Sequence, residues 1–124
     1  MSKEARSWDS KPPLPISDKA SRFYISIDSK YLSEAYNLSD GDIVSGKIIK
    51  IFHQREELKE LSNREIKFIL YKLLGDTLFI LKEDWEELRE YGLVTNFIVS
   101  VRLEKAICKD GKEIPLYSKR DLEI

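Results

Sequence analysis

The chain has 124 residues, of which 42% are hydrophobic and 35% charged, and its 21 basic and 22 acidic residues leave a formal net charge of −1. This length fits one globular domain with one buried core. The near balance of charge excludes a basic field over the whole molecule that would attract nucleic acids or anionic lipids. The single cysteine, Cys108, excludes an intrachain disulfide framework.

No targeting or membrane signal stands out in the sequence. The N-terminal residues are polar, without the apolar stretch of a signal peptide, and no apolar run reaches the length of a membrane span. We therefore expect a cytoplasmic protein with no membrane partner. The sequence is rich in Ile, Lys and Glu and has one Gln and three Asn, a composition that favours a thermophilic source.

The N-terminal segment differs from the rest of the chain. Residues 1–21 are mostly polar and contain Pro12, Pro13 and Pro15, so we expect a flexible, extended arm. The run 12–15 is similar to ligands of proline-reading domains, which leaves an adaptor role with a protein partner open. The remaining residues, 22–124, are expected to form a single domain.

The first half of this domain, residues 22–73, predicts the order strand, helix, strand, strand. The expected elements are a strand at 23–27, a helix at 29–36, a strand at 43–51 and a strand at 66–73. Gly41 and Asp42 form a structural turn before the second strand: glycine permits positive φ, and the carboxylate can accept backbone amides. A charged loop, residues 52–64, precedes the last strand.

The second half, residues 77–118, repeats this order. Without gaps, residues 23–51 lie over residues 78–106 at an offset of 55. The identical pairs are Ile25/Ile80, Tyr36/Tyr91, Leu38/Leu93, Ile43/Ile98, Val44/Val99, Ser45/Ser100 and Lys50/Lys105. Asn96 stands in the turn of this half and tolerates positive φ better than other non-glycine residues. A last strand is expected at 113–117, after an Asp110-Gly111 turn.

Together these elements predict a mainly β protein with two short helices. Two strand-helix-strand-strand units give a six-stranded β-barrel with pseudo-twofold symmetry. Alternation along the strands places Val44, Gly46 and Ile48 in its interior, with Val99, Val101 and Leu103 at the equivalent positions.

The first half carries a resemblance to a known group of folds. Its string of strand, helix, leucine, Gly-Asp and valine resembles the cradle-loop barrels, which include double-psi barrels, RIFT barrels and AbrB-type swapped-hairpin regulators. The residues that carry the resemblance are Ile25, Ile27, Leu32, Leu38, Gly41, Asp42 and Val44. The second half has Asn96-Phe97 in place of Gly-Asp, so the motif is present in one copy only.

The resemblance implies a fold and a class of function. AbrB-type barrels are assembled from two chains, whereas both halves lie in one chain here, which predicts a monomer. The implied function is a non-catalytic binding domain, an AbrB-like regulator associated with nucleic acid.

Four basic residues are the candidates for a nucleic-acid contact. Lys47 and Arg102 are repeat partners, as are Lys50 and Lys105, so a twofold axis would relate them on the outer face of the barrel. Paired cations on such a surface can contact phosphates. The alternative interpretation is ordinary solvated charge on exposed strands.

A second class of function is a barrel that binds a small molecule or nucleotide, with or without catalysis, beside the 52–64 loop. His53 and Arg55 are its candidate ligand-binding residues. No catalytic residues, metal site or cofactor are expected, because His53 is the only histidine, Cys108 lacks a visible partner and no phosphate-binding glycine loop is present.

Overall fold

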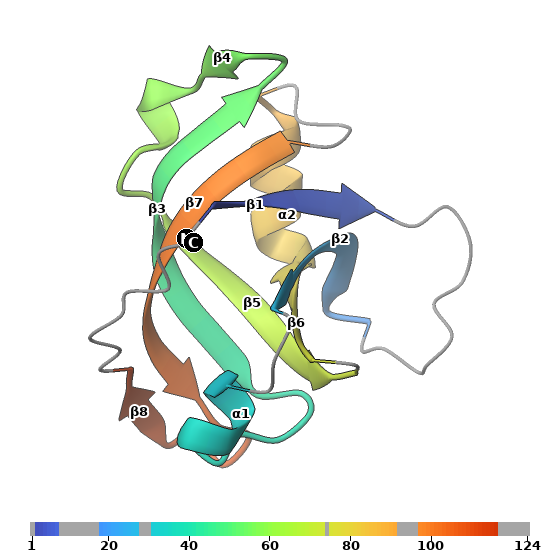
Figure 1. Ribbon diagram of the computed structural model, residues 1–124, viewed down its shortest axis with the longest axis vertical. Coiled ribbons are helices and arrows are strands. Elements are labelled where there is room, and N and C mark those ends of the chain that lie inside the picture. Colours follow the sequence, from blue (N-terminus) through green and yellow to red (C-terminus); the bar gives the residue numbers. More distant parts are fainter. Residues whose placement is uncertain (1, 8–17, 28–30, 74, 92–96, 117–124) are drawn as a thin grey trace.

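The computed structural model describes residues 2–7, 18–27, 31–73, 75–91 and 97–116 (Figure 1). The elements are β1 (Ser2–Ser7), β2 (Ala20–Ile27), α1 (Tyr31–Ala35), β3 (Ile43–His53), β4 (Glu56–Glu57), η1 (Lys59–Leu61), β5 (Glu65–Lys72), β6 (Asp76–Leu81), α2 (Lys82–Arg89), β7 (Phe97–Ile107) and β8 (Glu113–Pro115). The expectation of a mainly β chain with two short α-helices is confirmed. The expected number of six strands is wrong, because the described residues form an antiparallel sheet of eight strands.

The first additional strand lies in the segment expected to be a flexible arm. In β1, Arg6 is paired with Tyr24 of β2, and Lys3 is paired with Val99 of β7. A polar segment carries no alternating apolar face, so hydrophobic periodicity gives no sign of this strand. Backbone pairing holds it instead, with β7 along residues 2–5 and with β2 at Arg6 and Ser7. Pro12, Pro13 and Pro15 lie outside the described residues.

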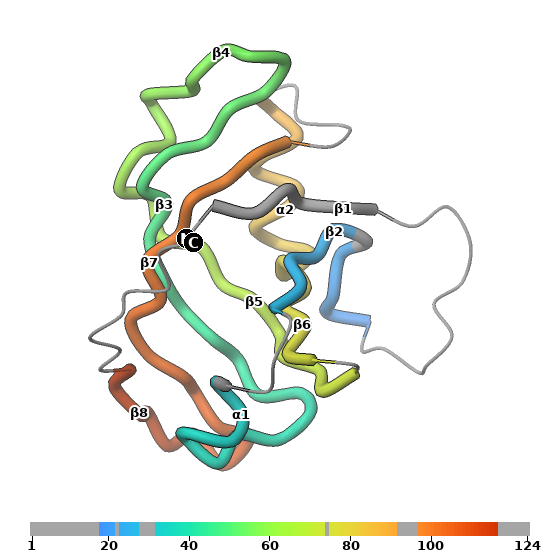
Figure 2. The backbone as a smooth tube through the Cα atoms, in the orientation of Figure 1, coloured from blue at the N-terminus to red at the C-terminus, as the bar shows by residue number. Residues whose placement is uncertain are grey.

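The strand pairings return to their starting point. β3 pairs with β5, the order continues through β6, β2, β1 and β7, and β7 pairs again with β3. The backbone path in Figure 2 shows β3 and β7 running beside each other along the length of the molecule. The two short strands, β4 and β8, pair antiparallel with the ends of β3 and β7.

Residues matched by the internal repeat face each other across two of these ladders. Tyr24 is paired with Phe79 on β2 and β6, and Lys47 is paired with Arg102 on β3 and β7. Both pairs are separated by the repeat offset of 55. A local twofold axis passes between directly opposite residues of an antiparallel pair. The repeat in the sequence therefore coincides with the register of the strands.

The pairing pattern also corrects the expected order within each unit. β1 lies between β2 and β7 as β5 lies between β6 and β3, whereas β8 pairs with β7 at the margin of the sheet. The two equivalent runs are thus β1-β2-α1-β3 and β5-β6-α2-β7. The expected unit begins one strand too late, because the polar sequence of β1 carries no alternating apolar pattern.

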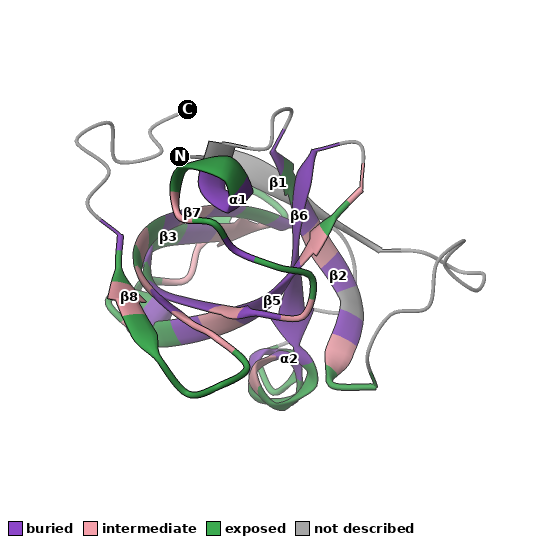
Figure 3. Cartoon of the chain, turned by 90° about the horizontal axis from the view of Figure 1, so that it is seen from below, coloured by how far each residue is buried: buried purple, intermediate pink, exposed green. Residues whose placement is uncertain are grey.

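The inward faces of the strands form one main core (Figure 3). Val44, Ile48 and Ile51 of β3 are buried in it, as are Val99 and Val101 of β7. α2 covers one side through Trp85, whose ring centroid lies 4.0 Å from that of Phe23. Leu103, expected in the interior, is only partly buried and packs at the core margin.

Gly46 is required where β3 and β7 approach each other closely. A Cβ atom at this position would lie 2.5 Å from the carbonyl oxygen of Arg102, closer than any Cβ can come. The absence of a side chain at Gly46 therefore brings the backbones of the two strands together beside the Lys47–Arg102 pair.

Candidate nucleic-acid interface

Lys47 and Arg102 lie directly opposite each other on β3 and β7. Both side chains are exposed. Ile48, the residue after Lys47 on β3, points to the opposite face of the sheet and is fully buried in the core. Cross-strand neighbours of this kind have Cβ atoms about 5 Å apart, and like charges at such positions repel each other. The structure therefore places two predicted site residues side by side on the outer face.

Two β-bulges bring the other predicted cations to this face. The ladder between β3 and β7 shifts register between Ile48 and Lys50 and between Ser45 and Gly46. The first shift leaves Ile49 and Lys50 both exposed, whereas strict alternation would have turned Lys50 inward. The second shift inserts Glu104 before Lys105, at the position that the repeat matches with Ile49.

The four cations differ in their partners. Lys105 Nζ lies 2.6 Å from Glu113 Oε1, and this hydrogen-bonded ion pair raises the pKa of Lys105 and lowers the pKa of Glu113. Lys47, Lys50 and Arg102 form no ion pair with any residue that the structure describes. Among the described residues, Lys47, Lys50 and Arg102 are thus the predicted cations without an ion-pair partner on the β3–β7 face.

The acidic neighbours of this face are partly engaged. Glu65 of β5 is opposite Lys47, but its carboxylate pairs with Lys67 Nζ at 3.7 Å. Glu113 is occupied by Lys105. Glu104 is exposed on β7 and reduces the positive potential near Lys105. The unpaired charge is thus concentrated at Lys47, Arg102 and Lys50.

Sequence reasoning missed Glu113 as the partner of Lys105. The signal was present in the Asp110-Gly111 turn, which predicts a hairpin between β7 and β8. That hairpin pairs Lys105 with Pro115, close to Glu113 along β8. A register worked out from the turn would have placed Glu113, opposite Ile107, diagonally across the hairpin from Lys105.

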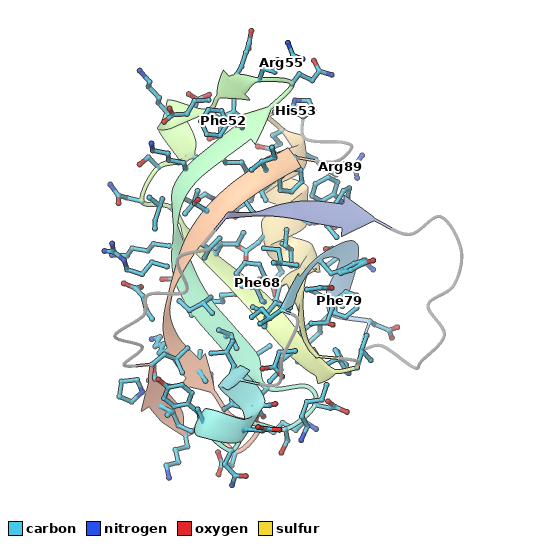
Figure 4. The ribbon with its side chains drawn as sticks, viewed as in Figure 1. Phe52, His53, Arg55, Phe68, Phe79 and Arg89 are labelled. Atoms are coloured by element: carbon cyan, nitrogen blue, oxygen red, sulfur yellow. The ribbon has the colours of Figure 1, made fainter. Side chains whose placement is uncertain are left out.

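The structure places His53 and Arg55 at the far end of β3 (Figure 4), whereas Lys47 lies near the middle of this strand. Gln54 and Arg55 have φ values of 53° and 70° and form the two-residue turn of a hairpin, in which His53 is paired with Glu56. Arg55 is exposed at the tip. His53 is half-buried, and its Nε2 atom has no hydrogen-bond partner among the described residues.

The 52–64 segment is held in place by contacts with the core, with β3 and with α2. Leu61 is buried in the main core, and Asn63 N donates a hydrogen bond to Ile48 O at 2.7 Å. Arg64 forms ion pairs with Asp84 and Glu87 of α2. Asp84 also accepts a hydrogen bond from Lys67 N at 3.0 Å, while partial burial raises the pKa of this carboxyl group.

The Gly-Asp turn joins distant parts of the chain. Gly41 has a φ of 92°, which favours glycine. Asp42 is 4% exposed, and its carboxylate accepts hydrogen bonds from Ser39 N at 2.8 Å and Lys109 N at 3.3 Å. The turn thereby holds the β7–β8 connection against the start of β3. Asn96, the expected turn residue of the second half, lies outside the described residues.

Comparisons with protein-family models, with curated proteins and with solved structures found no match to this chain. Among the described residues, none of the helices has the length and apolar composition needed to cross a membrane. The same residues contain no group of three or more His, Cys, Asp or Glu side chains placed to hold a metal ion.

Proposed function

We propose that this chain is a non-catalytic binding domain whose β3–β7 face contacts the phosphates of a nucleic acid. The observation that carries the proposal is the Lys47–Arg102 pair, two exposed cations directly opposite each other and without ion-pair partners among the described residues. Lys50 lies on the same face because of the bulge at Ile49. An anion that bridges the two strands would relieve their repulsion.

The proposal includes the architecture that presents this face. We propose a duplicated β-barrel of the cradle-loop type, formed by one monomeric chain. The cyclic order of pairings supports closure, and the opposition of Tyr24 to Phe79 and of Lys47 to Arg102 supports a pseudo-twofold axis. The buried carboxylate of Asp42 in the Gly-Asp turn is consistent with the AbrB-like resemblance.

The charge balance limits how such a protein would bind. A net charge of −1 provides no long-range attraction, so binding depends on local contacts by a few cations. Phosphate contacts of this kind carry no sequence information by themselves. We therefore expect weak, salt-sensitive binding with little preference for base sequence.

Fluorescence anisotropy with labelled duplex DNA and single-stranded RNA at low salt tests this function. The double substitution Lys47→Ala and Arg102→Ala should weaken binding about tenfold or more, because two charge-assisted contacts are lost. The matched control is Lys82→Ala and Arg89→Ala, which removes the same charge from exposed positions on α2. The control should bind like the unmodified protein. Absence of binding to both nucleic acids at low salt, or equal weakening in both variants, would overturn the proposal.

A further inference from the structure

A cavity of about 660 Å³ lies at the end of the strands opposite β4. Its lining residues lie where β3 begins and where β5 and β7 end. These strand ends are in the lower part of Figure 1. Its volume is in the range of small-molecule sites. The cavity is distant from the 52–64 segment, where a ligand site was expected, and it does not include the Lys47–Arg102 pair.

One wall of the cavity is apolar. Ile43 of β3 is paired with Ile69 of β5 on one side and with Ile107 of β7 on the other. Ile69 belongs to a small cluster with Phe79 and Leu81 that is separate from the main core. Tyr71 extends this wall, and its ring lies edge-on to Phe79 at a centroid distance of 5.9 Å. Ile43, Ile107 and Tyr71 are partly exposed on this wall, and Ile69 is buried beside them. The wall thus offers a small surface for an apolar group.

Lys109, another lining residue, is a positioned cation. Lys109 N is held by the buried carboxylate of Asp42, and the Lys109 side chain passes over Gly41. A Cβ atom at Gly41 would lie 2.7 Å from Lys109 Cε, so the glycine makes room for this path. Lys109 forms no ion pair within the described part of the chain, and its ammonium group is available at the rim.

The remaining rim residues are Lys19, Asp40 and Cys108. Asp40 directs one carboxylate oxygen to Lys72 N, which donates a hydrogen bond at 2.7 Å. Burial, with the nearby charge of Asp42, raises the pKa of the Cys108 thiol, so this residue adds no negative charge near neutral pH. The charges of Lys19 and Lys109 are balanced by the carboxylates of Asp40 and Asp42, both of which accept hydrogen bonds from backbone amides. The Lys109 ammonium is the group that can meet an anion here.

We propose that this cavity binds a small organic anion with an apolar body, such as an aromatic or branched aliphatic carboxylate or phosphate monoester. The apolar body lies against Ile43, Ile69 and Ile107, and the anionic group binds the Lys109 ammonium. This site is independent of the nucleic-acid face, because the two share no residue.

Titration of the ¹⁵N-labelled protein followed by NMR tests the site with phenyl phosphate and phenylacetate as probes. The amide signals of Gly41, Tyr71 and Lys109 should shift with a saturable dependence on probe concentration. Comparison of the two probes tells whether a phosphate or a carboxylate is preferred. Inorganic phosphate, which lacks the apolar body, and phenethylamine, which carries the opposite charge, should bind at least about tenfold more weakly.

The substitution Lys109→Met keeps the aliphatic stem and removes the charge. It should weaken binding of the preferred probe about tenfold or more, with the dispersion of the spectrum unchanged. Lys112→Met, an exposed position in the same turn that does not line the cavity, is the matched control and should bind normally. The proposal is overturned if neither anionic probe shifts these signals, if phenethylamine or inorganic phosphate binds equally well, or if Lys109→Met has no effect.

Discussion

At the scale of single residues, the outer face of β3 and β7 is defined by which cations have partners. Lys105 and Lys50 are identical residues at matched positions of the repeat, yet only Lys105 has an acidic side chain within ion-pair distance among the described residues. The difference arises because β8 supplies Glu113 on one side of the face. The repeat therefore predicts the positions of the cations but not their free charge.

The Lys105–Glu113 pair leads to a prediction about pH. The hydrogen bond and charge of Lys105 favour the ionised form of Glu113 and lower its pKa. This contribution to stability is present above the unfolded-state pKa and is lost as the pH falls through the lowered folded-state value. Lys105→Met should therefore raise the Glu113 pKa toward its ordinary value, measured by NMR titration of the side-chain carboxyl carbon.

The matched control for this titration is Lys50→Met, which removes a lysine at the equivalent position that has no carboxylate partner among the described residues. This variant should leave the Glu113 pKa unchanged. An unaltered pKa of Glu113 in Lys105→Met would show that the two side chains do not form the ion pair in solution.

At the scale of elements, the apolar strands could be predicted and the polar or irregular ones could not. The expected strand at 43–51 corresponds to β3, and its expected repeat in the second half corresponds to β7, because their alternating apolar residues face the core. β1 has no such pattern, and the β3–β4 turn is made by Gln54-Arg55 without a glycine. Tertiary pairing determines these elements.

The same limit applies to the candidate site. The repeat offset predicts that Lys47 and Arg102 are equivalent, and the register places them opposite each other. The bulges at Ile49 and Glu104 leave no sign in the pattern of residue types, so the outward position of Lys50 could not be derived by simple alternation. The cavity beside Lys109 is lined by four segments that are far apart in the sequence, so no local sequence pattern predicts it.

A single proline substitution in β1 distinguishes a paired strand from a flexible arm. Glu4 is opposite Ile98 of β7, within the ladder that pairs residues 2–5 with this strand. Glu4→Pro should lower the free energy of unfolding by about 2 kcal/mol or more, because proline removes an amide donor and restricts the ladder. Glu4→Ala is the control and should change it by less than about 1 kcal/mol. Chemical denaturation measures both, and two equally harmless substitutions would contradict the assignment of β1 as a paired strand.

At the scale of the whole molecule, a nearly neutral chain carries a small group of cations, Lys47, Lys50 and Arg102, that have no ion-pair partner among the described residues. The two runs β1-β2-α1-β3 and β5-β6-α2-β7 bring β3 and β7 together at the centre of the proposed barrel symmetry. That arrangement explains why Lys47, Lys50 and Arg102, which come from the two halves of the repeat, lie on one face of the sheet. The cavity beside Lys109 lies toward one end of the same two strands.

The salt dependence of nucleic-acid binding tests the central claim most directly. Three phosphate contacts by Lys47, Arg102 and Lys50 predict that the logarithm of the duplex-DNA binding constant falls with the logarithm of salt concentration with a slope of about −2 to −3. In the Lys47→Ala and Arg102→Ala double variant the slope should fall to about −1. An identical slope in the two proteins, or no dependence on salt in either, would contradict the account.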